Sequence, residues 1–222
     1  KIFSSHFLKI RDKNKKLFWF HAASIGEIQS ILPLVNKINK MHPNVEFLIT
    51  TITLTSGNLF KQKFKDRPNI KHRYFPVDVS FLAKKFLNDW QPDLVLFVDS
   101  EIWPNFLLEI KNKKIPLVLL NGRITKKTFL KWKIILSTAR KIFDTFDLCL
   151  LSNKESIDYL KNFKAKNIKY LGNLKLSVEY NRNGLIDNNK EWFKKRKVWC
   201  ALSTHEGEDI FCLKTHLELR KK

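Results

Sequence analysis

The stretch that decides the fold is Leu17-Phe18-Trp19-Phe20-His21-Ala22-Ala23-Ser24-Ile25-Gly26-Glu27. Its first part, residues 17–22, has the length and apolar composition of a buried strand. A short polar turn follows, and the apolar spacing over residues 28–40 predicts a helix. A buried strand that passes through a tight turn into a helix is the repeating unit of a parallel α/β sheet.

The same unit recurs along the chain. Further strands are predicted at residues 47–52, 72–75, 94–98, 115–120, 148–151 and 168–171, and the helices between them at 57–65, 80–90, 103–112, 126–143 and 154–163. Apolar strands separated by helices indicate a parallel sheet that is covered on both faces. The sequence therefore predicts an α/β, Rossmann-like, doubly wound parallel sheet.

Four regions are predicted. Residues 1–16 form a basic segment, 17–171 the Rossmann-like domain, 172–189 a linker rich in Asn and Gly, and 190–222 the start of a second domain. That last region is predicted to contain a helix at 190–197, a strand at 198–202 and a helix at 208–220. One strand and two helices cannot bury a core of their own, so we expect a truncation inside the second domain.

Composition limits the choice of partners. The 222 residues carry a formal net charge of +21, which favours anionic partners, and an A+T-rich coding sequence would produce the same excess of lysine. Cys149 and Cys200 lie in apolar runs that predict buried strands, and with Cys212 they make an odd count without a C-x-x-C spacing. We therefore expect reduced thiols. No apolar run of 18 residues indicates a bilayer-spanning helix.

Ligands of open parallel sheets bind at the carboxyl ends of the strands, so the loops there are the candidate site. Ser24, Gly26 and Glu27 offer free backbone N–H groups and a carboxylate, or alternatively form a capping box. Residues 50–57 supply clustered hydroxyls, or alternatively a strand running into a helix cap. Residues 99–105 and 121–123 supply carboxylates, an aromatic ring and a guanidinium that can clamp an anion. The candidates in these three loops are Thr53, Thr55, Gly57, Glu101, Trp103, Asn105 and Arg123.

A last loop, residues 203–208, again brings hydroxyls, a glycine and acids to a helix start. A metal site built from His205, Glu206 and Asp209 lacks a second group of ligands, and no His-Glu-x-x-His motif occurs, so no metal site is predicted.

Together these loops resemble one family, the 3-deoxy-D-manno-octulosonic acid (Kdo) transferases. The resemblance rests on His21-Ala22-Ala23-Ser24-Ile25-Gly26-Glu27, residues 50–57, Pro76-Val77-Asp78, Glu101-Ile102-Trp103-Pro104-Asn105, Asn121-Gly122-Arg123-Ile124, Gly172-Asn173-Leu174-Lys175 and Ser203-Thr204-His205-Glu206-Gly207-Glu208. Two departures stand out. Asp99-Ser100-Glu101 has Ser where the family usually has Thr, and Leu176-Ser177 replaces Phe-Asp.

The resemblance implies the N-terminal half of a GT-B glycosyltransferase. It implies inverting, metal-independent transfer of Kdo from CMP-Kdo to lipid A precursor (lipid IVA), with no cofactor. Glu27 would be the general base, and its place near a helix N-terminus would keep it ionised and weak. Ser24, Gly26, Thr53, Thr55, Gly57, Glu101, Trp103, Asn105 and Arg123 would position the acceptor or substrate. Lys175, Ser203, Thr204, His205 and Glu206 would lie on the donor side.

A lipid acceptor gives the positive charge a second explanation. Lys9, Arg11, Lys13, Lys15 and Lys16 would hold the protein on an anionic membrane surface, at the cytoplasmic face of the bacterial inner membrane. The alternatives are another GT-B nucleotide-sugar transferase or epimerase, and an inactive partial gene product. Nucleic-acid binding is disfavoured, because the lysines are scattered rather than clustered on one helix.

Overall fold

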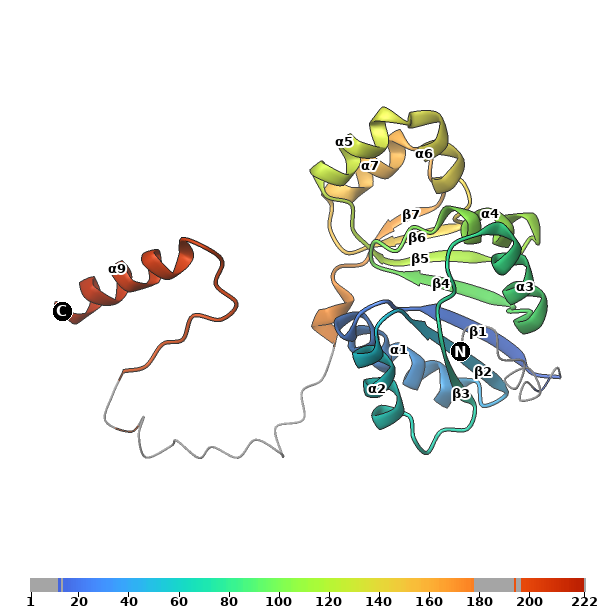
Figure 1. Cartoon of the computed structure of the whole chain (residues 1–222), viewed down its shortest axis with the longest axis horizontal. Helices are drawn as coiled ribbons and strands as arrows, with labels where there is room; N and C mark the ends of the chain where they lie inside the picture. Colours follow the sequence, from blue (N-terminus) through green and yellow to red (C-terminus); the bar gives the residue numbers. More distant parts are fainter. Residues whose placement is uncertain (1–11, 13, 178–193, 195–196, 222) are drawn as a thin grey trace. The chain divides into compact units, whose positions relative to one another are not determined.

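The computed structural model of the chain describes residues 12, 14–177, 194 and 197–221 (Figure 1). Contacts divide the chain into two compact units, residues 1–179 and 180–222. The division falls inside the predicted linker. The predicted domain boundaries themselves stay a prediction.

The first unit is built on a seven-stranded parallel sheet with the order β3-β2-β1-β4-β5-β6-β7. Its strands are β1 (Lys16–His21), β2 (Val45–Thr51), β3 (Ile70–Tyr74), β4 (Leu94–Val98), β5 (Leu117–Gly122), β6 (Leu148–Leu151) and β7 (Ile168–Tyr170). The order reverses between β1 and β4, which run side by side with Phe18 opposite Leu94. The prediction of a Rossmann-like, doubly wound sheet is confirmed. Its switch point lies between β1 and β4, and ligands of such sheets bind there.

Helices cover both faces of this sheet (Figure 1). They are α1 (Ile25–Met41), α2 (Leu54–Lys63), α3 (Ser80–Trp90), α4 (Pro104–Asn112), α5 (Lys126–Ile134), α6 (Leu136–Phe143) and α7 (Glu155–Asn162). Buried residues of α1 and α2 form one core cluster with alternate strand residues such as Phe20 and Phe47. Buried residues of α3, α4, α6 and α7 form the other with Trp19 and Leu48. Both faces of the sheet are thus covered by helices, and the carboxyl edge is the place where such sheets bind ligands.

Two elements of the first unit have other bounds in the structure than the sequence predicted. The helix predicted over residues 126–143 divides at Ile135, which leaves helical geometry (φ −113°, ψ 50°). The break lets α6 turn Ala139, Ile142 and Phe143 into the core, while α5 has no fully buried residue. β5 begins at Leu117, two residues later than predicted, because Pro116 has no N–H for the sheet.

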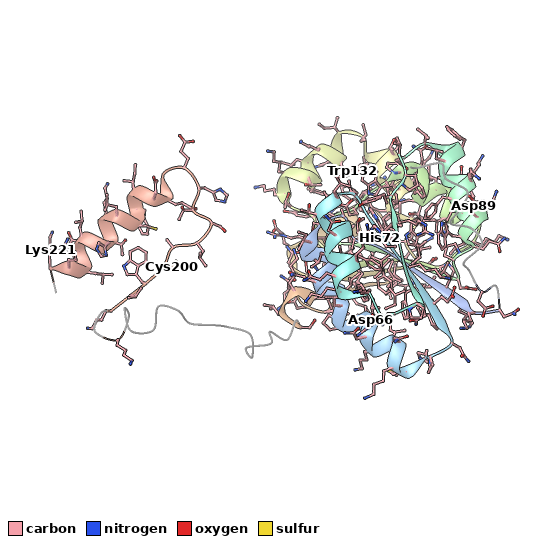
Figure 2. All side chains as sticks on the ribbon, turned by 60° about the horizontal axis from the view of Figure 1, so that its bottom comes forward. Asp66, His72, Asp89, Trp132, Cys200 and Lys221 are labelled. Carbon is pink, nitrogen blue, oxygen red and sulfur yellow. The ribbon has the colours of Figure 1, made fainter. Side chains whose placement is uncertain are left out.

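The prediction of a strand at residues 198–202 is wrong. These residues make no sheet pairing, because the described part of the second unit contains no strand to receive them. Cys200 is therefore exposed rather than buried, and Figure 2 shows it on the segment before α9 (Glu208–Arg220). The helix predicted at 190–197 lies almost wholly outside the described residues. Within the described residues, no helix is long and apolar enough to span a membrane.

Candidate active site at the carboxyl edge of the sheet

The Ser24–Glu27 loop opens at the switch point. Ser24 is the N-cap of α1, and its Oγ accepts from the N–H of Glu27 (3.3 Å) while donating to Oε1 of the same residue (2.8 Å). Oε2 of Glu27 accepts from the N–H of Ala23 (2.8 Å). The Ser24 half of the predicted capping box is thus observed, whereas the Glu27 carboxylate accepts from the N–H of Ala23 rather than from that of Ser24. These contacts hold the Glu27 carboxylate in one orientation at the mouth of the site.

The environment of Glu27 makes it a stronger base than a helix start alone implies. Only 8% of its surface is exposed. Burial raises the pKa of Glu27, the hydrogen bonds from Ser24 and Ala23 oppose that rise, and the charges of Glu101 and Asp99 add to it. The sequence predicted a weak base, because a helix N-terminus lowers the pKa of a nearby carboxylate. In the structure, desolvation raises the pKa of Glu27 by more than the two hydrogen-bond donors lower it.

Behind this loop a buried chain of polar groups fixes His21. The indole N–H of Trp19 donates to Oγ1 of Thr50 (2.9 Å), which lies 3.0 Å from Nδ1 of His21. The Thr50 hydroxyl has a second acceptor within reach, the carbonyl oxygen of Phe20, but that oxygen is farther away (3.4 Å). We therefore assign the hydroxyl as donor to Nδ1 of His21, which places the His21 proton on Nε2. Burial lowers the pKa of His21, so its ring is neutral at pH 7.

Glu101, after β4, meets this buried histidine. Its Oε2 accepts from the indole N–H of Trp103 (2.8 Å) and lies 3.4 Å from Nε2 of His21. Burial alone would raise the pKa of Glu101, but the N–H groups of His21 and Trp103 bring it below the ordinary value. Glu27 and Glu101 thus form a pair of carboxylates with opposite pKa shifts, which is the arrangement of groups with different roles in proton transfer.

The hydroxyl loop after β2 supports its own helix. Thr53 is the N-cap of α2 and accepts from the N–H of Ser56 (3.2 Å), and exposed Thr55 donates to Thr53 (3.3 Å). Ser56 also reaches the carbonyl of Ala23 (3.3 Å), which links this loop to the Glu27 loop. Gly57 allows α2 to approach β3, because a Cβ there would lie 2.5 Å from the hydroxyl of Tyr74. These contacts are structural, so the substrate roles of Thr53, Thr55 and Gly57 stay predictions.

Asn105 has a structural partner as well. The first turn of α4 has no cap from its own N-terminal residue, Trp103. Asp78 supplies one from the loop after β3, accepting from the N–H of Asn105 (3.2 Å) and of Phe106 (2.9 Å). The Asn105 side chain in turn donates to the carbonyl of Asp78 (2.8 Å). This cap ties the start of α4, directly after the Glu101–Trp103 loop, to the loop after β3.

Lys175 comes to the same edge from the end of the first unit. The 3₁₀ turn η2 (Leu174–Ser177) is tied to β5, because the N–H of Leu174 donates to Oδ1 of Asn121 (2.8 Å). Nζ of Lys175 then lies 3.4 Å from Oδ2 of Asp99. Asp99 and Asn121 both adopt positive φ angles, 62° and 58°. The part of the predicted linker at residues 174–177 therefore belongs to the first unit.

Arg123 stands exposed after β5, with no ion pair among the described residues. It borders a cavity of about 220 Å³ that Asp99 and Ser100 also line, with Ile102, Trp132 and Phe143 among its apolar walls. Ser100 donates to the carbonyl of Arg123, which joins the two loops. A guanidinium without a carboxylate partner is available to an anionic ligand.

The remaining candidates lie in the second unit. Ser203, Thr204, His205 and Glu206 are all exposed. The N–H of His205 donates to the carboxylate of Glu208 (2.9 Å), and Ser203 has a positive φ of 55°. The described residues contain no group of three His, Cys, Asp or Glu side chains arranged to hold a metal. The donor-side roles stay predictions.

Comparison with known proteins decides the family. The family model for 3-deoxy-D-manno-octulosonic-acid transferase (kdotransferase) matches residues 3–178. The chain belongs to the Kdo transferase family. A 3-deoxy-D-manno-octulosonic acid transferase of Rickettsia bellii is 33% identical over 96% of this chain and 51% of its own length. One from Haemophilus influenzae is 29% identical over 92% of this chain and 48% of its own. The chain thus spans about half the length of these Kdo transferases.

Solved structures agree on the fold. A UDP-N-acetylglucosamine 2-epimerase matches with a TM-score of 0.58 at 15% identity, covering 80% of this chain and 54% of its own. A putative UDP-N-acetylglucosamine 2-epimerase from Listeria monocytogenes also gives 0.58, at 13% identity, over 82% and 52%. At such identity the likeness concerns the fold alone. It supports the predicted N-terminal half of a GT-B architecture.

Two residues of the site lie in the predicted loops, but no role was predicted for either of them. His21 and Thr50 link the core to Glu101, yet both lie on strands and are fully buried. The sequence did contain a signal for a buried His21: side chains alternate along a strand, so Leu17, Trp19 and His21 of β1 share one face. A buried histidine needs a polar partner; Thr50 provides one at Nδ1, and the Glu101 carboxylate lies 3.4 Å from Nε2.

Proposed function

We propose that the chain is the acceptor-binding half of an enzyme that transfers Kdo from CMP-Kdo to the lipid A precursor lipid IVA. The observation that carries the proposal is the buried Glu27 carboxylate, held at the switch point by Ser24 and Ala23 and facing the charges of Glu101 and Asp99. Membership of the Kdo transferase family supports the donor sugar, Kdo.

Glu27 acts as the general base. It takes the proton from an acceptor hydroxyl as that oxygen attacks the anomeric carbon of Kdo, and CMP leaves with the electron pair of the broken C–O bond. Attack opposite to the leaving group inverts the configuration. A base with a raised pKa accepts this proton more readily, and Ser24 and Ala23 keep it aimed while the bond forms.

The other groups position substrates. Glu101, ionised and fixed by Trp103, accepts from hydroxyls of the acceptor or donor. Arg123 binds an anionic group, either a lipid A phosphate or the Kdo carboxylate. Lys175 and the residues of 203–206 serve the donor side, and neither a metal nor a cofactor takes part. We place the reaction at the cytoplasmic face of the bacterial inner membrane.

The 222-residue chain alone is proposed to be inactive, so the test uses a chimaera. In it, this chain replaces the matching half of the Rickettsia bellii transferase, which it covers over 51% of that protein. Purified chimaera is incubated with lipid IVA and either CMP-Kdo or UDP-N-acetylglucosamine. Kdo transfer with CMP-Kdo alone is the expected result. Absence of transfer to lipid IVA by a folded chimaera that still binds CMP-Kdo through its Rickettsia bellii half would contradict the assignment of this chain as the lipid IVA-binding half.

A further inference from the structure

Helix α5 is packed on one side and carries an apolar pair on the other. Phe129 stacks on Tyr159 (4.3 Å between ring centroids) and Trp132 packs against Phe143 (5.7 Å), so these two residues mark the inner side. At 100° per residue, Leu130 and Ile134 fall on the opposite side, one turn apart. They are 50% and 84% exposed.

Lysines flank this apolar pair. Lys126, Lys127, Lys131 and Lys133 are exposed, and their positions on the helix place them on both sides of Leu130 and Ile134. None of the four has an ion pair among the residues that the structure describes. Residues 121–143 as a whole contain seven Lys or Arg and no Asp or Glu. Residues 121–143 therefore carry a local formal charge of +7.

We propose that Lys126, Lys127, Leu130, Lys131, Lys133 and Ile134, here called the α5 surface, bind an anionic lipid bilayer. Leu130 and Ile134 enter the boundary between head groups and acyl chains, and the lysines extend to the lipid phosphates. A nucleic acid would satisfy the lysines and leave both apolar side chains in water. An acidic protein would need a complementary apolar groove, whereas a bilayer accepts an apolar ridge of any shape.

The α5 surface differs from the membrane contact predicted at the start of the chain. Lys9, Arg11 and Lys13 of that contact lie outside the described residues, whereas α5 begins three residues after Arg123, at the edge that carries the candidate site. A bilayer bound there would bring membrane lipids next to the acceptor side. The inference rests on the helix itself and does not depend on the catalytic role of Glu27.

The test is co-sedimentation of the whole chain with vesicles of phosphatidylcholine, with and without phosphatidylglycerol. The wild-type chain should bind the anionic vesicles, and added salt should weaken the binding. Lys127→Gln with Lys131→Gln should weaken it roughly 30-fold, from the known attraction of two surface lysines. Lys37→Gln with Lys40→Gln, which removes the same charge from α1, is the matched control and should change it less than about twofold.

The apolar pair is tested separately. Leu130→Ser with Ile134→Ser should weaken binding about tenfold or more at unchanged net charge, whereas Met41→Ser, also at an exposed apolar residue, should have no effect. Thermal melting checks that each variant is folded. Equal binding by the α5 and control variants, or binding to neutral vesicles as strong as to anionic ones, would overturn the proposal. Binding of the lysines to RNA with no need for Leu130 and Ile134 would overturn it too.

Discussion

Two helix starts lie side by side at the carboxyl edge of the sheet and use the same local chemistry. Ser24 caps α1 by accepting from the N–H of Glu27, and Thr53 caps α2 by accepting from the N–H of Ser56. Each first turn also contains a glycine, Gly26 or Gly57. Sequence alone gives both loops the same description, a hydroxyl cap followed by a small residue at a helix start.

The glycines separate the two loops. A Cβ on Gly57 would meet the hydroxyl of Tyr74 at 2.5 Å, whereas a Cβ on Gly26 would meet nothing within 4 Å. Protein therefore fills the space beside Gly57, and the space beside Gly26 is left open next to a buried carboxylate. A side chain at Gly57 would require Tyr74 and His72 to shift, whereas one at Gly26 would require no neighbour to move. Under the proposed function, the acceptor occupies this open space beside Gly26.

The largest expected effect is on catalysis. Gly26→Ala in the chimaera should lower the rate of Kdo transfer about 100-fold, because a methyl group would displace the acceptor by about 1 Å from the base. The same variant should raise the free energy of unfolding by up to about 1 kcal/mol, since alanine favours a helix over glycine. Transfer within twofold of wild type would show that the open space has no role in the reaction.

Gly57→Ala should have the opposite pattern. The added methyl group collides with Tyr74, so the free energy of unfolding should fall by about 1–3 kcal/mol in chemical denaturation. Transfer per folded molecule should stay near wild type. Adding Tyr74→Phe removes the atom that the methyl meets first, and should recover part of the loss. No loss in the single variant would contradict the packing account.

The two capping side chains should contribute equally to the free energy of unfolding, but only Ser24 should affect how the rate of Kdo transfer depends on pH. Ser24→Ala and Thr53→Ala should each lower the free energy of unfolding by about 1 kcal/mol. Of the two capping side chains, Ser24 donates to the Glu27 carboxylate and Thr53 does not, so the loss of Ser24 should raise the pKa of Glu27 further. The acidic limb of the pH–rate profile should then move to higher pH in Ser24→Ala. A shift of the same size in Thr53→Ala would remove the distinction between the loops.

The smallest expected effect concerns His72 on β3, whose ring lies next to Gly57. His72, labelled inside the first unit in Figure 2, has its Nε2 2.9 Å from Oγ1 of Thr51 and stacks on Phe60. Burial, with Arg73 and Lys61, lowers its pKa to about 4. Its folded pKa is below the unfolded value of about 6.5, so protonation favours unfolding, and stability should fall as the pH drops from about 6.5 to 4. Denaturation across this range should show a shallower slope in His72→Gln, with the part due to His21 remaining.

Local pattern was enough to predict the sheet. All seven strands and the helices between them were predicted from the apolar pattern. An apolar run such as residues 94–98 is buried whichever strands it pairs with. The strand predicted at 198–202 failed because a strand needs a neighbour, and an apolar run carries no information about whether one exists. Ile135 broke a predicted helix for a related reason. Helix α5 packs through Phe129 and Trp132, and α6 packs through Ala139, Ile142 and Phe143. One straight helix over residues 126–143 would not make both sets of contacts.

The site was predictable as loops and not as contacts. The motif containing Glu27 and the loop containing Glu101 could be assigned to the same edge of the sheet, since strand ends meet there. That His21 lies 3.4 Å from Glu101, 80 residues away, depends on the adjacency of β1 and β4. That Asp78 caps α4, and that Gly57 but not Gly26 is packed, likewise depends on elements brought together only by folding.

The most direct measurement of the central claim is single-turnover Kdo transfer by chimaeras carrying Glu27→Gln or Glu101→Gln, with CMP-Kdo binding and thermal melting recorded for both. If Glu27 is the base, Glu27→Gln should lower the transfer rate about 10²- to 10⁴-fold while CMP-Kdo binding and the melting temperature stay near wild type. Glu101→Gln should act mainly on substrate affinity. Full transfer by Glu27→Gln, with loss of the chemical step in Glu101→Gln, would contradict the account and assign the base to Glu101.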